Sequence, residues 1–302
     1  MRRVSGKGDA RGRAIIVAKA PGTLWVIATP IGNLEDLSPR AQRLLAEVDL
    51  VVCEDTRHSG RLLAAFGIKQ RLASLHEHNE ARVTPGLVER LAGGESMALI
   101  SDAGTPLLSD PGYRLVRAAA QAGVTISPVP GPSALLAGLS LAGLPTDRFA
   151  FEGFLPAREK ARRARLQALE DETRTLVFFE SGNRVAGLLQ DAAACLGAER
   201  EAVLARELTK LHEQVYRDSL AGLAERVRED PDASRGEMVV LVAGRADVPA
   251  GGGDRALLQQ LLPALLEELP PSRAVKLAVK LSGVPRREVY ELALKLGGPG
   301  VQ

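Results

Sequence analysis

The sequence predicts an α/β protein with two successive α/β domains and a small helical module at its C-terminal end. Short apolar segments alternate with helical segments at regular spacing, which is typical of a mainly parallel, doubly wound sheet. The apolar segments are continuous rather than alternating, as expected for strands buried on both faces. At 302 residues, the chain is also long enough to favour more than one core.

The first domain is predicted to span residues 22–145. It starts with a strand at 24–28, and a helix begins at Ser38 and Pro39, because proline is favoured in the first helical position. The following strands are predicted at 50–53, 72–75, 97–100 and 125–129, and the helices at 62–66, 87–91, 112–122 and 133–142. Ligands are expected at the carboxyl ends of these strands.

A linker at 144–147 is predicted to lead into a second α/β domain at residues 146–245. Its predicted elements are strands at 149–153, 176–179, 203–205 and 238–243, and a basic helix at 157–169. Residues 246–302 are predicted to contain a flexible joint at 251–253 and helices at 272–281 and 285–296, spaced like a helix-turn-helix module. Residues 1–21, which are basic and rich in glycine, are predicted to form a flexible tail.

Composition excludes several classes of protein. Aromatic residues make up 3% of the chain, too few for a surface that binds single strands by stacking. The net charge of +2 is too small to indicate nucleic-acid binding by itself, so a basic binding surface would have to come from local clusters. No apolar segment approaches a membrane span or a signal peptide, and Cys53 and Cys195 are predicted to be buried thiols. We therefore expect a cytoplasmic protein without a membrane partner.

Three loops that follow predicted strands are rich in glycine, proline and small polar residues. They lie at 29–33, 101–106 and 130–134, and the last leads directly into a helix. Glycine lets a backbone approach a ligand closely, and proline reduces the entropy lost on binding. The loops contain no lysine, and the P-loop and dinucleotide fingerprints are missing, so a nucleoside with an amino-acid head group fits better than a triphosphate. Each loop alone could be an ordinary turn, but together they favour a binding site.

Longer runs carry a specific resemblance. They are Thr-Pro-Ile-Gly-Asn-Leu at 29–34, Glu-Asp-Thr-Arg-His at 54–58, Ser-Asp-Ala-Gly-Thr-Pro at 101–106, Asp-Pro-Gly-Tyr at 110–113, Glu-Gly-Phe-Leu-Pro at 152–156 and Ala-Arg-Glu-Leu-Thr-Lys at 205–210. On these runs the chain resembles the tetrapyrrole methylase superfamily, and within it the branch that methylates ribosomal RNA. The resemblance spans about residues 22–245 and is weak beyond them.

The resemblance implies a two-domain, class III S-adenosylmethionine methyltransferase that holds its cofactor between the domains. It also implies a homodimer that methylates the ribose 2′-hydroxyl of a cytidine in the decoding centre of 16S ribosomal RNA, in the small ribosomal subunit. Asn33 and Thr105 stand where porphyrinoid methylases often carry Asp, which favours the ribosomal branch. A porphyrinoid methylase and a non-catalytic RNA-binding assembly factor remain alternatives.

The resemblance further implies a set of cofactor-binding residues in the three loops and after the strand at 176–179. They are Ile31, Gly32, Ala103, Gly104, Thr105, Leu108, Ser133, Ala134 and Glu180. Asp102, in the same loop as Ala103, is a further candidate that could orient cofactor or substrate groups.

A ribose hydroxyl is a poor nucleophile near neutral pH, so transfer needs a base or a polarising cation. His58, His76 and His78 follow predicted strands and titrate in the useful range, which makes them candidate bases. They could equally be polar loop residues. A metal site at His76, Glu77 and His78 is not favoured, because no further ligand pattern accompanies them.

Substrate contacts are predicted from charged clusters. Glu54, Asp55 and Arg57 are expected to face the substrate, or to form an internal salt bridge. Two basic clusters could contact RNA phosphates, or could simply be solvated helix faces. They comprise Arg158, Lys160, Arg162, Arg163 and Arg165, and Arg273, Lys276, Lys280, Arg286 and Arg287; among them Arg162, Arg163, Arg286 and Arg287 are the predicted substrate-binding residues.

Overall fold

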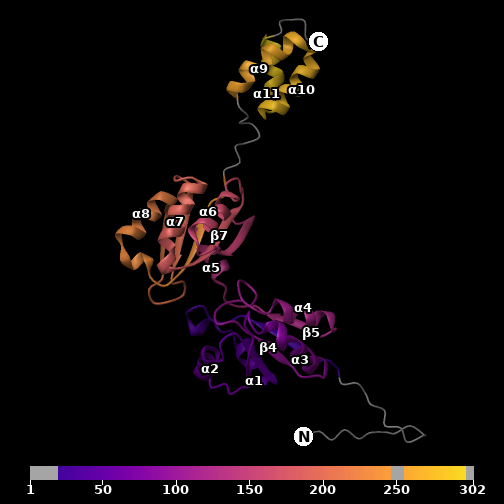
Figure 1. Ribbon diagram of the computed structural model, residues 1–302, viewed down its shortest axis with the longest axis vertical. Helices are drawn as coiled ribbons and strands as arrows, with labels where there is room; N and C mark the ends of the chain where they lie inside the picture. Colours follow the sequence, from indigo (N-terminus) through magenta and orange to yellow (C-terminus); the bar gives the residue numbers. More distant parts are fainter. Residues whose placement is uncertain (1–19, 246–254, 297–302) are drawn as a thin grey trace, which may run out of the picture.

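The computed structural model describes residues 20–245 and 255–296. Two α/β domains follow one another along the chain, and a bundle of short helices comes after them (Figure 1). The predictions for the tail before residue 20 and for the joint at 251–253 lie outside the described residues.

The sheet of the N-terminal domain is fully parallel, as predicted. Its strand order is β3-β2-β4-β1-β5. The strands are β1 (Thr23–Ile27), β2 (Leu50–Cys53), β3 (Leu72–Ser74), β4 (Met97–Leu99) and β5 (Thr125–Val129). The helices around it are η1 (Leu34–Asp36), α1 (Pro39–Glu47), α2 (Thr56–Ala65), α3 (Glu80–Ala92) and α4 (Tyr113–Gln121).

Both faces of this sheet are covered, which explains why its central strands β2 and β4 are continuously apolar. One cluster of buried residues joins the sheet to α1 and α2, through side chains such as Leu45 and Leu63. A second cluster joins the opposite face to α3 and α4, through Leu91 and Leu115. Cys53 belongs to the first cluster, so the prediction of a buried thiol is confirmed there, whereas Cys195 is half-buried.

Local capping explains where the helices begin. The Ser38 side chain accepts a hydrogen bond from Ala41 N, and Pro39 occupies the first position of α1, as the sequence indicates. The start of α4 depends on a residue that the sequence analysis did not single out. Buried Glu80 directs Oε1 to the backbone N–H groups of Gly112 and Arg114, at 3.1 and 2.8 Å.

The sheet of the C-terminal domain is mostly antiparallel, with strand order β6-β7-β10-β8-β9. Only β6 and β7 run parallel. Its strands are β6 (Phe149–Phe154), β7 (Thr175–Ser181), β8 (Glu201–Arg206), β9 (Gln214–Ser219) and β10 (Glu237–Val242), and α6 (Glu159–Gln167), α7 (Gly182–Leu196), α8 (Leu220–Glu229) and η2 (Pro231–Ser234) accompany them. Leu166, Leu189 and Leu223 pack α6, α7 and α8 onto one face.

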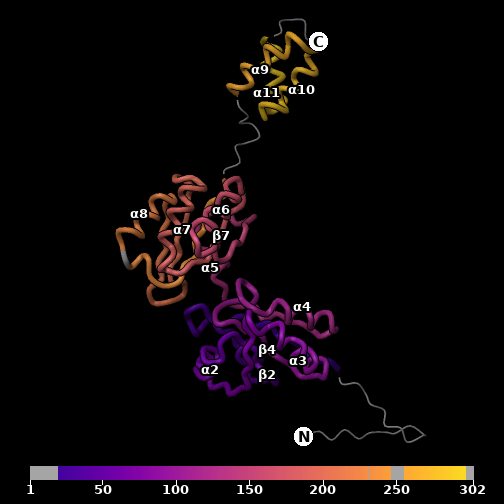
Figure 2. The backbone as a smooth tube through the Cα atoms, viewed as in Figure 1, coloured from indigo at the N-terminus to yellow at the C-terminus, as the bar shows by residue number. Residues whose placement is uncertain are grey.

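The other face of the second sheet is covered by α5 (Ala134–Ala142), a helix that precedes the predicted linker. Its side chains Leu135 and Leu139 pack with residues of β7, β8 and β10. Arg217 of β9 donates to the carbonyl oxygens of Leu141 and Ala142 at the end of α5, where the helix dipole favours a cation. The packing therefore crosses the predicted boundary between residues 145 and 146, and the backbone trace shows α5 beside the second domain (Figure 2).

The C-terminal module contains α9 (Arg255–Glu268), α10 (Pro271–Ser282) and α11 (Arg286–Leu296). It has its own small core, which includes Leu262, Val275 and Val289. Gly283 ends α10 in a left-handed conformation with φ of 67°, which is the turn that the sequence predicts. Within residues 20–245 and 255–296, no helix combines the length and the apolar character that a membrane crossing requires.

Candidate active site

A cavity of about 320 Å³ lies between the two α/β domains. The N-terminal domain supplies Ile31, Asp102, Ala103, Gly104, Thr105, Leu108, Ser109 and Asp110, and the start of α5 supplies Ser133 and Ala134. The C-terminal domain supplies Phe154, Phe179, Glu180, Ser181, Leu208, Lys210, Glu237, Met238 and Val239. The volume is that of a small-molecule site.

The three glycine- and proline-rich loops form one connected structure at the cavity. Thr29 and Gly104 exchange two backbone hydrogen bonds, of 2.8 and 3.0 Å, which join the first loop to the second. Thr105 Oγ1 donates to Pro132 O at 3.0 Å, which joins the second loop to the third. Gly104 has φ of 84°, a conformation that favours glycine at this crossing point.

All but one of the residues predicted to bind the cofactor line this cavity. The exception is Gly32, which lies beside it against the C-terminal domain. A Cβ atom on Gly32 would come within 2.3 Å of Lys210 Cγ and 2.9 Å of Thr209 Oγ1. Gly32 therefore allows the first loop to meet the loop after β8, and its structural role is close contact between domains.

The C-terminal side of the cavity is largely apolar, and most of its residues were not predicted. Phe179 contacts Phe151 and Phe154 edge to face, with ring centroids 4.8 and 5.8 Å apart. Phe154 stays 55% exposed although it is a large apolar side chain. The sequence runs at 152–156 and 205–210 indicated part of this region. The lining residues at the end of β7 and the start of β10 could not be predicted, because these segments have the apolar pattern of any buried strand.

Glu180 is the buried charge on that side. Its Oε1 accepts a hydrogen bond from Ser181 N at 2.9 Å. Its Oε2 lies 3.1 Å from Arg184 Nη2 but has no hydrogen-bond partner among the described residues. Because a buried oxygen without such a partner is costly, Glu180 has spare acceptor capacity at the cavity for a ligand that donates hydrogen bonds.

Carboxylates gather at the opposite edge, after β2 and β4. Asp102 Oδ1 accepts a hydrogen bond from Asp55 N at 3.2 Å, which ties the two loops together. Burial raises the pKa of Glu54, and the nearby charge of Asp102 raises it further. Burial also raises the pKa of Asp110 to about 6, and Glu54 and Asp102 add to this effect, against a hydrogen bond from Ser101 that lowers it.

None of the three predicted histidines lines the cavity. His58 is exposed in the first turn of α2, and His78 is exposed after β3. His76 is half-buried and lies near Glu54, whose pKa its charge lowers. Among the described residues, no group of three or more Cys, His, Asp or Glu side chains is arranged to hold a metal ion.

The predicted substrate cluster at the start of α2 contains an internal ion pair. Asp55 caps α2 by accepting from the N–H groups of Arg57 and His58, and Arg57 Nη2 lies 3.2 Å from Asp55 Oδ2. The hydrogen bonds from Arg57 lower the pKa of Asp55 to about 2. Of the two alternatives from the sequence, the salt bridge is therefore present, and Arg57 remains exposed next to it.

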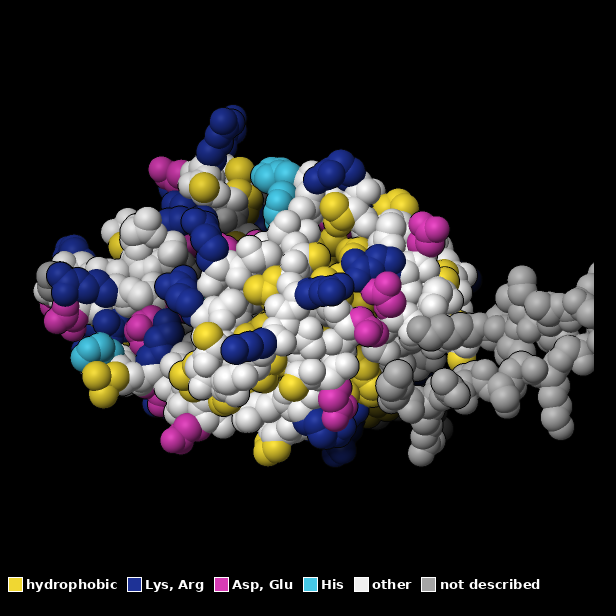
Figure 3. Space-filling model, turned by 90° about the horizontal axis from the view of Figure 1, so that it is seen from below, with side chains coloured by type: hydrophobic (Ala, Val, Ile, Leu, Met, Phe, Trp, Pro, Cys, Tyr) yellow, Lys and Arg dark blue, Asp and Glu magenta, His cyan; other side chains and the backbone are white. Residues whose placement is uncertain are grey.

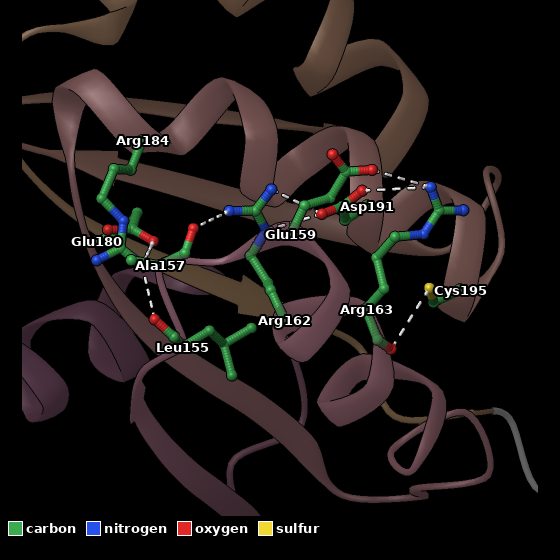
Figure 4. Close-up of polar contacts among 9 residues, drawn as sticks. All are labelled: Leu155, Ala157, Glu159, Arg162, Arg163, Glu180, Arg184, Asp191 and Cys195. Carbon is green, nitrogen blue, oxygen red and sulfur yellow. Dashed lines mark hydrogen bonds and ion pairs between the residues drawn. The ribbon is translucent and has the colours of Figure 1, made fainter.

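One predicted RNA contact is wrong. The Arg162 side chain is only 11% exposed, and its Nε and Nη2 atoms lie 2.8 and 2.7 Å from Asp191 Oδ2 on α7 (Figure 4). A guanidinium that is buried on a carboxylate cannot reach an RNA phosphate. Arg163 also pairs with Asp191 and Glu159, but it is partly exposed.

The other predicted pair, Arg286 and Arg287, lies at the exposed start of α11. Within the part of the chain that the structure describes, Arg287 pairs only with Glu291 of its own helix, at 3.1 Å, and its side chain is 90% exposed. On the end of the molecule formed by the N-terminal domain, Lys and Arg side chains occur in separate groups with acidic side chains between them (Figure 3). The positions of Arg286 and Arg287 are compatible with contact to phosphates.

Comparison with known proteins defines the class. The family model of the Tetrapyrrole (Corrin/Porphyrin) Methylases matches residues 23–224, and that of the RsmI C-terminal HTH domain matches residues 252–297. The chain therefore belongs to the tetrapyrrole methylase family. This confirms the predicted fold class and the helix-turn-helix character of the C-terminal module.

Within that family, the chain is similar over most of its length to proteins named ribosomal RNA small subunit methyltransferase I. The protein of that name from Pseudomonas aeruginosa is 53% identical over 92% of this chain and 98% of its own. Those from Xylella fastidiosa and Escherichia coli O157:H7 are 52% and 46% identical, over 89% and 92% of this chain and 98% and 96% of theirs.

Solved structures share the fold of the two α/β domains. Uroporphyrin-III-C-methyltransferase from Thermus thermophilus superposes with a TM-score of 0.51 at 23% identity, over 74% of this chain and 94% of that one. Diphthine synthase superposes with a TM-score of 0.54 at 16% identity, over 73% and 89%. At these identities the comparison concerns the fold alone.

Proposed function

We propose that the protein transfers a methyl group from S-adenosylmethionine to ribosomal RNA of the small subunit. The observation that carries the proposal is the high identity to the named ribosomal RNA methyltransferases, which extends through both α/β domains and the C-terminal module. More finely, we propose that the target is the ribose 2′-hydroxyl of a cytidine in the decoding centre of 16S ribosomal RNA. The protein would act as a cytoplasmic homodimer on the small ribosomal subunit.

The cavity fits the proposed methyl donor in three respects. Its volume of about 320 Å³ suits a nucleoside joined to an amino acid. The free acceptor capacity of buried Glu180 suits the hydroxyl or amino donors of an adenosyl group. The Asp102 carboxylate suits the positive charge of a sulfonium, since opposite charges attract.

The residues divide these tasks between the domains. The loop at 101–106 and the start of α5 bring backbone and small side chains to the ligand, which allows close approach. Phe179, Met238 and Val239 form the apolar side, which excludes water from the reacting atoms. When bound, the donor supplies an electrophilic methyl group, and the protein must align the acceptor oxygen and accept its proton.

Methyl transfer from labelled S-adenosylmethionine to small ribosomal subunits tests the proposal. The subunits are isolated from a strain that lacks the protein, and nuclease digestion then locates the label. We expect the label on the 2′-oxygen of one cytidine. Transfer to a porphyrinoid substrate, or no transfer to RNA, would overturn the proposed function.

A cavity-filling variant tests where the donor binds. Ala134→Phe adds a ring at the start of α5, where Ala134 lines the cavity. It should weaken binding of S-adenosylhomocysteine by roughly tenfold or more, because overpacking of this kind costs about 1–3 kcal/mol. Leu136→Phe is the matched control, since Leu136 is exposed on the same helix and does not line the cavity. Equal calorimetric affinities for both variants would place the donor elsewhere.

A further inference from the structure

Asp110 lies on a strained loop at the cavity. Leu107 and Ser109, both within three residues of it, have φ values of 76° and 70°. Side chains with a Cβ atom rarely adopt this left-handed conformation, and it costs free energy wherever it occurs. Such strain persists where the surrounding structure requires a particular placement of the chain, and here the loop brings Asp110 to the cavity.

Each of the other carboxylates that line the cavity lies beside a cation or a backbone donor, although Glu180 Oε2 keeps spare acceptor capacity. Lys210 Nζ lies 2.8 Å from Glu207 Oε1 and 3.0 Å from Glu237 Oε2, so the lysine and Glu237 neutralise one another. Glu180 faces Arg184. Asp102 accepts a hydrogen bond from the backbone of the loop after β2.

Asp110 differs from this set in its surroundings. The groups that act on its carboxyl are the Ser101 hydroxyl and the two carboxylates Glu54 and Asp102, which come from the ends of β4 and β2 and the loop between β4 and α4. None of these groups is a cation, and within residues 20–245 and 255–296 no lysine or arginine forms an ion pair with Asp110. A carboxylate that lines a cavity without a cationic partner is available to accept a proton from a ligand.

We propose that Asp110 is the general base of the reaction and accepts the proton of the substrate hydroxyl during methyl transfer. This inference rests on the proposed function, and it replaces the three histidines, which do not line the cavity. The acceptor oxygen forms a bond to the methyl carbon of S-adenosylmethionine as the carbon–sulfur bond breaks. The electron pair of that bond stays on sulfur, which becomes a neutral thioether, and the proton moves from the acceptor oxygen to the Asp110 carboxylate.

The ionisation of Asp110 suits this task. Burial raises the pKa of Asp110 to about 6, and the charges of Glu54 and Asp102 contribute in the same direction. A base with this pKa is ionised at neutral pH and holds a proton more firmly than an ordinary aspartate. The neutral form that follows proton transfer is also the form that burial favours.

Single-turnover methylation of small ribosomal subunits, with saturating donor and across pH, tests the role. Asp110→Asn should lower the rate by roughly 10²–10⁴-fold and leave S-adenosylhomocysteine and RNA binding unchanged. Asp110→Glu should recover part of the rate, because it restores a carboxylate. Asp147→Asn, in the exposed linker, is the matched control and should keep the wild-type rate.

The pH profile separates a base from a structural residue. The logarithm of the wild-type rate should rise with unit slope up to about pH 6 and then level off. Glu54→Gln removes a charge that raises the pKa of Asp110 and should move the midpoint to lower pH.

The outcomes distinguish the two proposals. If the wild-type protein methylates RNA and Asp110→Asn keeps its rate and profile, the role of Asp110 is refuted and the proposed function stands. If the variant loses donor affinity in proportion to rate, Asp110 binds the donor and is not the base. If the wild-type protein methylates a porphyrinoid and not RNA, both proposals fail together.

Discussion

Helices α6 and α11 both carry dense runs of arginine, but the structure uses the two runs differently. On α6, Arg162 is buried against Asp191 of α7, and Arg165 pairs with Glu152 of β6 at 2.6 Å. On α11, Arg287 pairs with Glu291 of its own helix and stays almost fully exposed. A cluster of arginines in the sequence thus indicates a basic helix. Which of these arginines remain free to bind a partner depends on the carboxylates that neighbouring elements place beside them.

Removal of one member of the buried pair should have the largest effect on stability. Arg162→Ala leaves buried Asp191 with the longer contact to Arg163, 3.8 Å from Oδ1, and loss of the close partner should cost about 3 kcal/mol of unfolding free energy. Urea unfolding measures the loss. Replacement of both partners, by Arg162→Met with Asp191→Leu, should recover most of it, because no unpaired charge remains. If Arg162→Ala were as stable as the wild type, the Arg162–Asp191 pair would contribute no more to stability than the exposed arginines of α11.

The exposed arginines of α11 should instead affect RNA binding. Arg286→Ala with Arg287→Ala should reduce the slope of log Kd against log salt concentration by about 1.5, since each lost phosphate contact retains its counterion. Filter binding to 16S ribosomal RNA at several salt concentrations gives the slope. Stability should not change, because both side chains lie at the surface. Arg163→Ala, on α6, is the comparison variant, and an equal slope change there would remove the distinction between the helices.

Asp110 extends the comparison to carboxylates, because Asp191 pairs with Arg162 whereas no described lysine or arginine pairs with Asp110. Folding raises its pKa from 3.8 to about 6, so the folded state favours the protonated form. Its contribution to stability is therefore greatest below about pH 4 and is lost as the pH rises through about 6. Asp110→Asn cannot ionise and should be modestly more stable than the wild type at pH 7.5, with the difference vanishing near pH 4. Thermal unfolding across this range would contradict the assignment if the variant were less stable at neutral pH.

The N-terminal domain was well predicted because the apolar pattern of its strands agrees with their burial in the folded sheet. The central strands β2 and β4 are continuous apolar runs, and helices cover both faces of the sheet. The loops at 29–33, 101–106 and 130–134 follow strands of one parallel sheet, so they meet at one edge. That geometry is why nearly all of the predicted cofactor residues line the same cavity.

The C-terminal domain was harder to predict for physical reasons. Because α5 covers the second face of its sheet, the central strands are as continuously apolar as parallel strands, and direction cannot be read from the pattern. The edge strand β9 buries little and carries few apolar residues, so it gave no signal. The burial of Arg162 could have been predicted from the sequence. Arg162 lies four residues before buried Leu166 and therefore on the inner face of α6.

The packing of α5 also constrains how ligands reach the cavity. This helix belongs by sequence to one domain, yet its apolar side is part of the core of the other. A hinge at residues 144–147 would have to pull α5 off the second sheet, which would expose Leu135 and Leu139 to water. The packing therefore ties α5 to the C-terminal domain and moves the joint between the two domains to residues 130–133, the third loop at the cavity. A relative movement of the domains would act directly on this loop and so on the ligand that it contacts.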